Sequence, residues 1–218
     1  MRLRITFSKD GPMAYTSHLD LMRVWERALR RACVPLAYSH GFNPRPKLQL
    51  ASALPLGFTA GAELLDIWLE EPMKSGGEGQ GDNSVAAEVA RVLPPVLPKG
   101  LSVCEVRSVD PKGPAMQTQI MSTQYKVTVE WDETAEQVEA RIKQVLAATE
   151  LPYQRRGRQR DLRPLIERLR LERADEGMVL LGMQLAARPG ATGRPERVLD
   201  ALGMGEAFAR YHRRRLIE

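Results

Sequence analysis

The order of strand-like and helix-like segments in the first half of the chain constrains the fold more than any other feature. Residues 2–8 alternate apolar and polar side chains, as a strand with one buried face does. Ser17 then begins a helical pattern that Pro35 ends, and Asp20 stands where a carboxylate stabilises a first helical turn. The elements predicted after this helix are a strand at 47–54, a strand at 62–70, a short helix capped by Ser84, and a strand at 101–109.

This βαββαβ order is typical of the ferredoxin-like pattern, in which two helices cover one face of a four-stranded antiparallel sheet. The second half of the chain repeats the plan without visible sequence identity. Its predicted elements are strand 124–131, helix 134–149, strand 178–186, helix 195–202 and strand 208–217. Residues 163–171 fit a helical period as well as a strand, and we expect a short helical turn followed by a strand.

The sequence therefore predicts an α+β protein of two tandem ferredoxin-like (βαββαβ) domains with antiparallel sheets. We expect the N-terminal domain at 1–110 and the arginine-rich C-terminal domain at 124–218. Residues 111–123 contain prolines, a glycine and several polar side chains, which indicates a linker. The glycine-rich stretch 74–81 is predicted to be a loop. In each domain the sheet face opposite the helices is expected to be open to a partner.

Length and cysteine usage bound the class of protein. A chain of 218 residues, 43% of them hydrophobic, can bury two cores. Cys33 and Cys104 each stand among apolar neighbours, which predicts buried thiols in a reducing compartment. No apolar run is long enough to cross a bilayer, and residues 1–7 alternate like a strand instead of forming a signal peptide. We therefore expect a cytoplasmic protein that is not associated with a membrane.

The positive charge of the chain favours a polyanionic partner. The formal net charge is +5, and the excess of Lys and Arg lies mainly in the second half, in clusters at 155–160 and 213–215. The first cluster contains four arginines and no acid: Arg155, Arg156, Arg158 and Arg160. These arginines repel one another unless they meet an anion, which indicates a nucleic-acid contact; the alternative is a disordered basic loop.

The loop at 38–47 is the most distinctive segment of the N-terminal half. Its prolines and glycine restrict the backbone, so we expect a stiff loop that presents its side chains to a partner. The preceding helix bears an arginine stripe that either grips successive phosphates or forms a solvated face balanced by Asp20 and Glu26. Tyr38 and Phe42 are candidates for stacking on a base. The residues predicted to bind RNA are Arg23, Arg27, Arg30, Arg31, Tyr38, Ser39, His40, Phe42, Asn43, Arg45, Lys47, Arg155, Arg156, Arg158, Arg160 and Arg163.

Motifs for catalysis are few. The three histidines and two cysteines lack metal-ligand spacing, and no phosphate-binding glycine loop or hydrolase elbow is present, so we expect no metal and no cofactor. His18 is a candidate general base if the loop folds back to place Tyr15, Ser39, His40 and Lys47 around it. Two ferredoxin-like domains with such a histidine resemble the metal-independent endoribonucleases that process CRISPR RNA, although the glycine-rich loop of those enzymes near the C-terminus is not seen here.

Five segments occur in the order associated with one family: Ser17-His18-Leu19-Asp20-Leu21-Met22-Arg23, Tyr38-Ser39-His40-Gly41-Phe42-Asn43-Pro44-Arg45-Pro46, Ala53-Leu54-Pro55-Leu56-Gly57, Glu63-Leu64-Leu65-Asp66 and Asp161-Leu162-Arg163-Pro164. On these segments, and over nearly its whole length, the chain resembles the radical-SAM-linked proteins. These form a domain family of unknown function found beside, or fused to, a radical SAM protein. The resemblance implies gene neighbours that encode ribosomal proteins and an RNase of the E/G type, and hence work on RNA. It supplies no catalytic residues.

The cysteine count separates this chain from the enzyme that the resemblance names. A radical SAM enzyme needs three closely spaced cysteines to hold its iron-sulfur cluster, and this chain has two cysteines. The expected role is an RNA-binding or adaptor protein that presents ribosomal or transfer RNA to a radical SAM partner and is not an enzyme by itself. Two alternatives stay open: a metal-independent endoribonuclease, and a pure protein-interaction module whose open sheet docks the radical SAM subunit.

Overall fold

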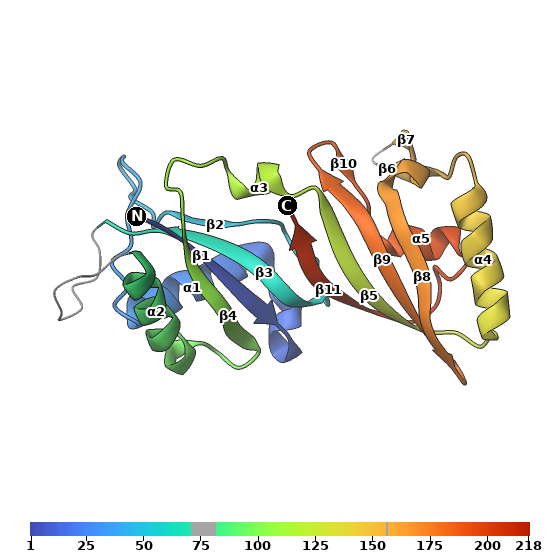
Figure 1. The fold of residues 1–218 in the computed structure, drawn as a ribbon, viewed down its shortest axis with the longest axis horizontal. Coiled ribbons are helices and arrows are strands. Elements are labelled where there is room, and N and C mark those ends of the chain that lie inside the picture. The colour runs from blue at the N-terminus through green and yellow to red at the C-terminus, as the bar shows by residue number, and fades with distance from the viewer. Residues whose placement is uncertain (71–81, 156) are drawn as a thin grey trace. The chain divides into compact units, whose positions relative to one another are not determined.

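The computed structural model describes residues 1–70, 82–155 and 157–218 of a mixed α+β protein (Figure 1). The chain divides into two compact units, Met1–Gln119 and Ile120–Glu218. Every strand pairing described inside either unit is antiparallel. The loop predicted at 74–81 and the side chain of Arg156 lie outside the described residues.

The N-terminal unit follows the predicted order of elements. These are β1 (Arg2–Lys9), a 3₁₀ turn (Gly11–Tyr15), α1 (His18–Arg31), β2 (Leu48–Leu50), β3 (Thr59–Trp68), α2 (Asp82–Val92), a 3₁₀ turn (Pro94–Val96), β4 (Leu101–Val109) and α3 (Met116–Gln119). The spatial order of the strands is β2-β3-β1-β4. Two details differ from the prediction: β2 is shorter than the expected strand at 47–54, and Ser84 lies inside α2 instead of capping it.

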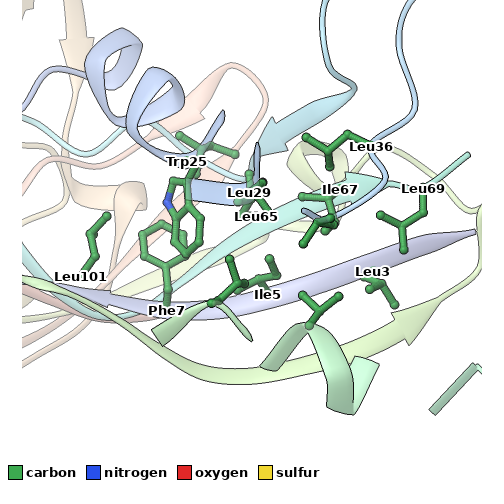
Figure 2. Close-up of a cluster of buried hydrophobic side chains, with 14 of the residues drawn as sticks. Leu3, Ile5, Phe7, Trp25, Leu29, Leu36, Leu65, Ile67, Leu69 and Leu101 are labelled. Carbon is green, nitrogen blue, oxygen red and sulfur yellow. The ribbon is translucent and has the colours of Figure 1, made fainter. Parts of the chain in front are cut away.

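One face of this sheet packs on α1 and α2 to form the core (Figure 2). Leu3, Ile5 and Phe7 alternate along β1 and are fully buried, as their spacing predicts. The rings of Phe7 and Trp25 meet edge to face, with centroids 4.9 Å apart and planes inclined by 66°. The apolar stripe of α1 is thus fixed against β1 by a large aromatic pair, and the arginines of α1 are left on its outer side.

The opposite face of the N-terminal sheet is not open, contrary to prediction. Arg2 and Arg4 on β1 both bind the buried carboxylate of Asp66 on β3; Arg4 Nε donates to Asp66 Oδ1 at 2.8 Å. The chain after β4 lies over this cluster, because Arg2 Nη1 donates to the carbonyl oxygens of Asp110, Gly113 and Pro114 at 3.4, 3.2 and 3.3 Å. Much of the stretch predicted to be a linker, 111–123, is therefore packed structure: it contains α3 and the first residues of the next strand.

The C-terminal unit has the same arrangement with an inserted hairpin. Its elements are β5 (Ser122–Glu130), α4 (Ala135–Ala147), β6 (Pro152–Arg155), β7 (Arg158–Asp161), a 3₁₀ turn (Arg163–Leu165), β8 (Ile166–Asp175), β9 (Met178–Arg188), β10 (Ala191–Thr192), α5 (Pro195–Ala201) and β11 (Ala209–Ile217). The main strands are ordered β8-β9-β5-β11, and β10 pairs with the end of β9. Both α4 and α5 lie on one side of these strands (Figure 1). The β6-β7 hairpin stands between α4 and β8 in the sequence.

The two cysteines are exposed, so the prediction of buried thiols is wrong. Cys33 follows α1 in a tight turn with a φ of 56°, and Cys104 lies on the edge strand β4, where one side of the strand is unpaired. Apolar sequence neighbours did not predict burial because both positions are set by chain geometry. Of the helices that the structure describes, none has the length and apolar character needed to span a membrane.

Candidate nucleic-acid interface

The arginine cluster at 155–160, predicted to contact nucleic acid, lies on the β6-β7 hairpin and not in the disordered loop that was the alternative. Tyr153 pairs with Arg160, and Arg155 pairs with Arg158. Directly opposite residues and alternate residues of an antiparallel pair point to the same face, so these four side chains share one face of the hairpin. Gly157, with a φ of 73°, makes the turn in a conformation that L side chains rarely adopt. The hairpin therefore concentrates three guanidinium groups on one surface.

These arginines line a groove against the turn between β9 and β10. Arg155, Arg158 and Arg160, together with Gly190 and Thr192, enclose a depression of about 580 Å³. No carboxylate lines it, and within the described residues none of the three guanidinium groups forms an ion pair. Their mutual repulsion is uncompensated inside the protein, and an anion in the groove removes it.

Two neighbours hold the hairpin in place. Asp161 Oδ1 accepts hydrogen bonds from the backbone N–H groups of Leu151 and Arg163, at 2.7 and 2.9 Å. Leu162 is buried at the base of the hairpin. Arg163 Nε donates to the carbonyl of Leu146 at 3.1 Å, at the C-terminal end of α4. The predicted RNA-binding residue Arg163 is thus engaged in satisfying a helix end, and it does not line the groove.

An aromatic side chain lies next to the groove and was missed as a site residue. The guanidinium of Arg197 on α5 lies 5.9 Å from the ring centre of Tyr153, and Arg197 Nη1 donates to Asp200 Oδ2 at 2.8 Å. Tyr153 and Arg197 line a smaller depression of about 190 Å³. The alternation of Tyr153 and Arg155 along β6 could have indicated this, but only once the segment was known to be a strand.

Half of the arginine stripe on α1 is paired with acids within the protein. Three of its four arginines have internal partners: Arg23 pairs with Asp20 at 3.1 Å, Arg30 pairs with Glu26 at 2.9 Å, and Arg31 donates to the carbonyl of Val96 at 2.9 Å. Arg27 has no ion pair among the described residues and borders a mainly apolar depression with Val24 and Pro98. This agrees with the balanced, solvated face that the sequence left open as an alternative.

The loop at 38–47 is closed by its own hydrogen bonds. Tyr38 and Pro46 form a β-bridge, the N–H of Ser39 donates to the carbonyl of Arg45 at 2.8 Å, and the N–H of Arg45 donates to Ser39 Oγ at 3.0 Å. His40, Asn43, Arg45 and Lys47 are exposed, and Phe42 is fully exposed at the tip. The loop thus exposes Phe42 together with cationic side chains, whereas Tyr38, the other candidate for stacking, is half-buried and packs against the core. Base stacking stays a prediction.

The loop does not fold back on His18. The N–H of Ala37 donates to the carbonyl of Trp68, which pairs with the first residue of β1. His18 instead lies near the other end of β1. The carbonyl oxygen of Thr16, two residues before His18, accepts a hydrogen bond from Nζ of Lys9, the last residue of β1. Across β1 these two ends are roughly 24 Å apart. The cluster expected around His18 for the endoribonuclease alternative is therefore not assembled.

A second group of cations lies on the C-terminal sheet; Arg214 belongs to the cluster noted at 213–215, whereas Arg168 and Arg170 were missed. Arg168, Arg170 and Arg214 line a shallow depression with Gln124 and Gln184. Basic and apolar residues alternate along β8, and this alternation could have indicated the group. It was not recognised because residues 163–171 fit a helical period as well as a strand. No group of His, Cys, Asp and Glu suited to a metal ion occurs in the part of the chain that the structure describes.

Three of the solved structures that match this chain cover nearly all of it at low sequence identity. A chain of a Cbf5-Nop10-Gar1 complex has a TM-score of 0.53 and 10% identity, with 98% of this chain and 48% of that chain covered. A chain of an archaeal box H/ACA sRNP Nop10-Cbf5 complex has a TM-score of 0.49 and 11% identity, covering 98% and 47%. A chain of an H/ACA RNP bound to a substrate RNA containing 2'-deoxyuridine has 0.49 and 10%, covering 97% and 47%. This chain spans about half the length of the chains that it matches, and the likeness is one of fold.

Sequence comparison gives a family without an activity. No curated protein matches the chain. One family model does match, over residues 2–195, which include all of the N-terminal unit except Met1 and most of the C-terminal unit. The chain therefore belongs to the DUF2344 family, described as an uncharacterized protein conserved in bacteria.

Proposed function

We propose that this chain is a cytoplasmic RNA-binding protein that grips the phosphate backbone in the groove of the β6-β7 hairpin. The single observation that supports it is the convergence of Arg155, Arg158 and Arg160 on one polar depression without a carboxylate. Guanidinium groups bind phosphate oxygens bidentately, and the release of condensed counterions drives such binding. Tyr153, on the same face of the hairpin, adds an aromatic surface next to the cations.

The loop at 38–47 is the second element of the proposal. Phe42 is fully exposed, and burying such a ring on a base recovers apolar surface that water otherwise covers. Arg45 and Lys47 are exposed beside it and supply charge for the adjoining phosphates. In this proposal the α1 stripe contributes through Arg27, because its other arginines have internal partners.

Both units support the description as tandem ferredoxin-like domains. Numbered within each unit, the main strands have the spatial order 2-3-1-4, and the helices follow the first and third strands. The hairpin in the C-terminal unit is then an insertion after the first helix. Such an insertion on a rigid scaffold is a usual place for a binding element.

The proposed catalytic partner is a radical SAM protein, to which this chain presents its RNA. The sequence resemblance described above supports this partnership. The two cysteines lie on separate elements, Cys33 after α1 and Cys104 on β4, so the described residues offer no site where three thiolates could hold an iron-sulfur cluster. Co-purification of the two proteins that survives nuclease treatment supports the partnership. Loss of the complex after nuclease treatment means that RNA alone joins them.

RNA binding is tested by the variant Arg155→Gln, Arg158→Gln, Arg160→Gln. Fluorescence anisotropy with a labelled single-stranded RNA of mixed sequence measures affinity over a range of salt concentrations. Loss of three phosphate contacts is expected to lower the slope of log affinity against log salt by about 2. The matched control, Arg91→Gln, Arg107→Gln, Lys112→Gln, removes the same charge from exposed positions of the N-terminal unit and should leave the slope near that of the parent. Equal slopes for the parent and the hairpin variant would refute the proposal.

A further inference from the structure

The C-terminal sheet has a face that its helices do not cover. Along β9, Val179, Leu181, Met183 and Leu185 are buried against the helices, so the residues between them lie on the other face. Strand register extends this outer face to the neighbouring strands. Arg168 and Gln124 both pair with Gln184, while Arg170 and Lys126 both pair with Gly182. The outer face therefore carries arginine, lysine and glutamine side chains at its centre, while the same register places Leu180, Glu130 and Asp175 toward one end of it.

A single carboxylate organises the cations of this face. Glu172, whose side chain is 18% exposed, accepts a hydrogen bond from Arg170 Nη2 at 2.8 Å, and Arg214 Nη1 lies 3.5 Å from the same oxygen. Gly182 leaves the space for this contact, since a Cβ there would lie 2.6 Å from Glu172 Oε1. Two guanidinium groups share one acid, so the group keeps a net positive charge while its side chains are held over the sheet.

A third cation is uncompensated. Arg168 is exposed, borders the same depression as Arg170 and Arg214, and has no ion pair among the described residues. The other acid nearby, Glu167, is engaged by Ser122 Oγ at 2.6 Å and by the amide of Gln184 at 2.9 Å. The charge of this face is thus positive at its centre.

The chemistry of the outer face distinguishes between two kinds of RNA. Sheets that bind single-stranded RNA stack its bases on aromatic side chains. On the outer face of β5, β8 and β9, the described residues that register assigns to it include no Phe, Tyr or Trp. Double-stranded RNA is instead recognised through phosphates and 2'-hydroxyl groups, which suit guanidinium and amide side chains.

We infer that the outer face of the C-terminal sheet binds the sugar-phosphate backbone of base-paired RNA without regard to sequence. Arg168, Arg170 and Arg214 contact phosphates. The amides of Gln124 and Gln184 are joined to each other, to Glu167 and to Arg215, and their remaining N–H groups and oxygen lone pairs contact 2'-hydroxyl groups. This inference rests on the proposed RNA-binding function and adds a second site to it. The hairpin groove holds an unpaired segment, while the flat sheet face holds an adjoining helix of the same RNA.

The test compares three RNA forms on three proteins. The parent, the sheet variant Arg168→Gln, Arg170→Gln, Arg214→Gln and the hairpin variant described above are titrated with an RNA duplex, with one of its strands, and with a DNA duplex of the same sequence. Thermal unfolding checks that each protein is folded. The charge-preserving variant Arg168→Lys, Arg170→Lys, Arg214→Lys should keep the parent's salt slope on the duplex.

We expect the sheet variant to lose about 3 in the salt slope on the RNA duplex and little on the single strand. The parent should also prefer RNA duplex to DNA duplex, because the amides need 2'-hydroxyl groups. Parent-like duplex binding by the sheet variant, or an equal loss on duplex and single strand, would overturn the inference. In either case the proposed function is still tested by the hairpin variant, because the decrease in its salt slope on single-stranded RNA is measured separately. Absence of binding to all three nucleic acids by the parent would overturn both.

Discussion

Replacing Asp66 with asparagine is the sharpest perturbation of the N-terminal unit. Its carboxylate has no solvent exposure and receives hydrogen bonds from Arg2 Nε at 3.0 Å and from Arg4 Nε at 2.8 Å. Asp66→Asn keeps the volume of the side chain but removes the negative charge that both buried guanidinium groups bind. The variant therefore isolates the electrostatic part of the contact.

The expected loss follows from desolvation. Removing one partner from a buried ion pair costs about 3–5 kcal/mol, because the remaining charge stays out of water without compensation. Here one carboxylate serves two arginines, so we expect the upper part of this range. With a slope of about 2 kcal/mol per molar urea, the unfolding midpoint should fall by about 2 M. Trp25 is fully buried in the adjacent core, so its fluorescence reports the transition.

Arg2 also ties down the chain after β4, which provides a second measurement. Once Arg2 loses Asp66, the carbonyl oxygens of residues 110, 113 and 114 are held by an unpaired cation, and the segment should open more often. Trypsin cleavage at Lys112 is expected to accelerate. Asp10→Asn, at an exposed carboxylate of the same unit, is the control and should change the free energy of unfolding by less than about 0.5 kcal/mol. A loss below about 1 kcal/mol for Asp66→Asn would show that water reaches the arginines and would refute the reasoning.

Three further predictions concern the pH response and packing. The guanidinium of Arg141 lowers the pKa of Glu133 from its ordinary value of 4.5 to about 2. The ionised carboxylate therefore stabilises the fold above pH 4.5, and this contribution is lost as the pH falls from 4.5 toward 2. Glu133→Gln should flatten that part of an acid-unfolding curve followed by circular dichroism. Trp25→Ala should cost about 3–5 kcal/mol in urea unfolding, and a smaller loss would mean that the core collapses around the cavity. Thr134→Ala removes a capping box and should cost about 1 kcal/mol, with Thr134→Ser restoring most of it.

The elements best predicted from sequence are those whose signal is local. Ser17 was expected to cap α1, and its hydroxyl accepts from the backbone N–H of Asp20 at 3.1 Å. The strand predicted at 101–109 has the same bounds as β4, and the helical turn followed by a strand at 163–171 is confirmed. In each case neighbouring residues alone set the backbone, through a cap, an alternation or a proline at the start of a turn.

The features that sequence did not predict depend on partners far along the chain. Arg2 and Arg4 alternate with Leu3 and Ile5, so they were expected to face solvent. Their burial requires Asp66, more than sixty residues away, and the segment after β4 that covers them. No local pattern contains that pairing. The polar composition of 111–123 indicated a linker for the same reason, because its packing comes from carbonyl oxygens that any sequence possesses.

The β6-β7 hairpin was also not predicted as a pair of strands. A run of arginines has no apolar alternation to predict a strand, and β6 and β7 depend for their position on Asp161, the last residue of β7, and on Leu162, which follows it. The sequence did show that no acid stands among these arginines, and in the structure no carboxylate lines their groove.

The location of the nearest carboxylate separates the arginines that can bind phosphate from those that hold the fold. On α1, Asp20 and Glu26 stand three and four residues from Arg23 and Arg30, and the structure shows those pairs formed. Around Arg155 no acid stands within helical or hairpin reach, and no ion pair is described there. A phosphate that approaches Arg23 or Arg30 must displace an existing partner, whereas one that enters the hairpin groove relieves repulsion between like charges. If the proposed RNA binding holds, substitutions in the hairpin should therefore outweigh those on α1 in an RNA titration.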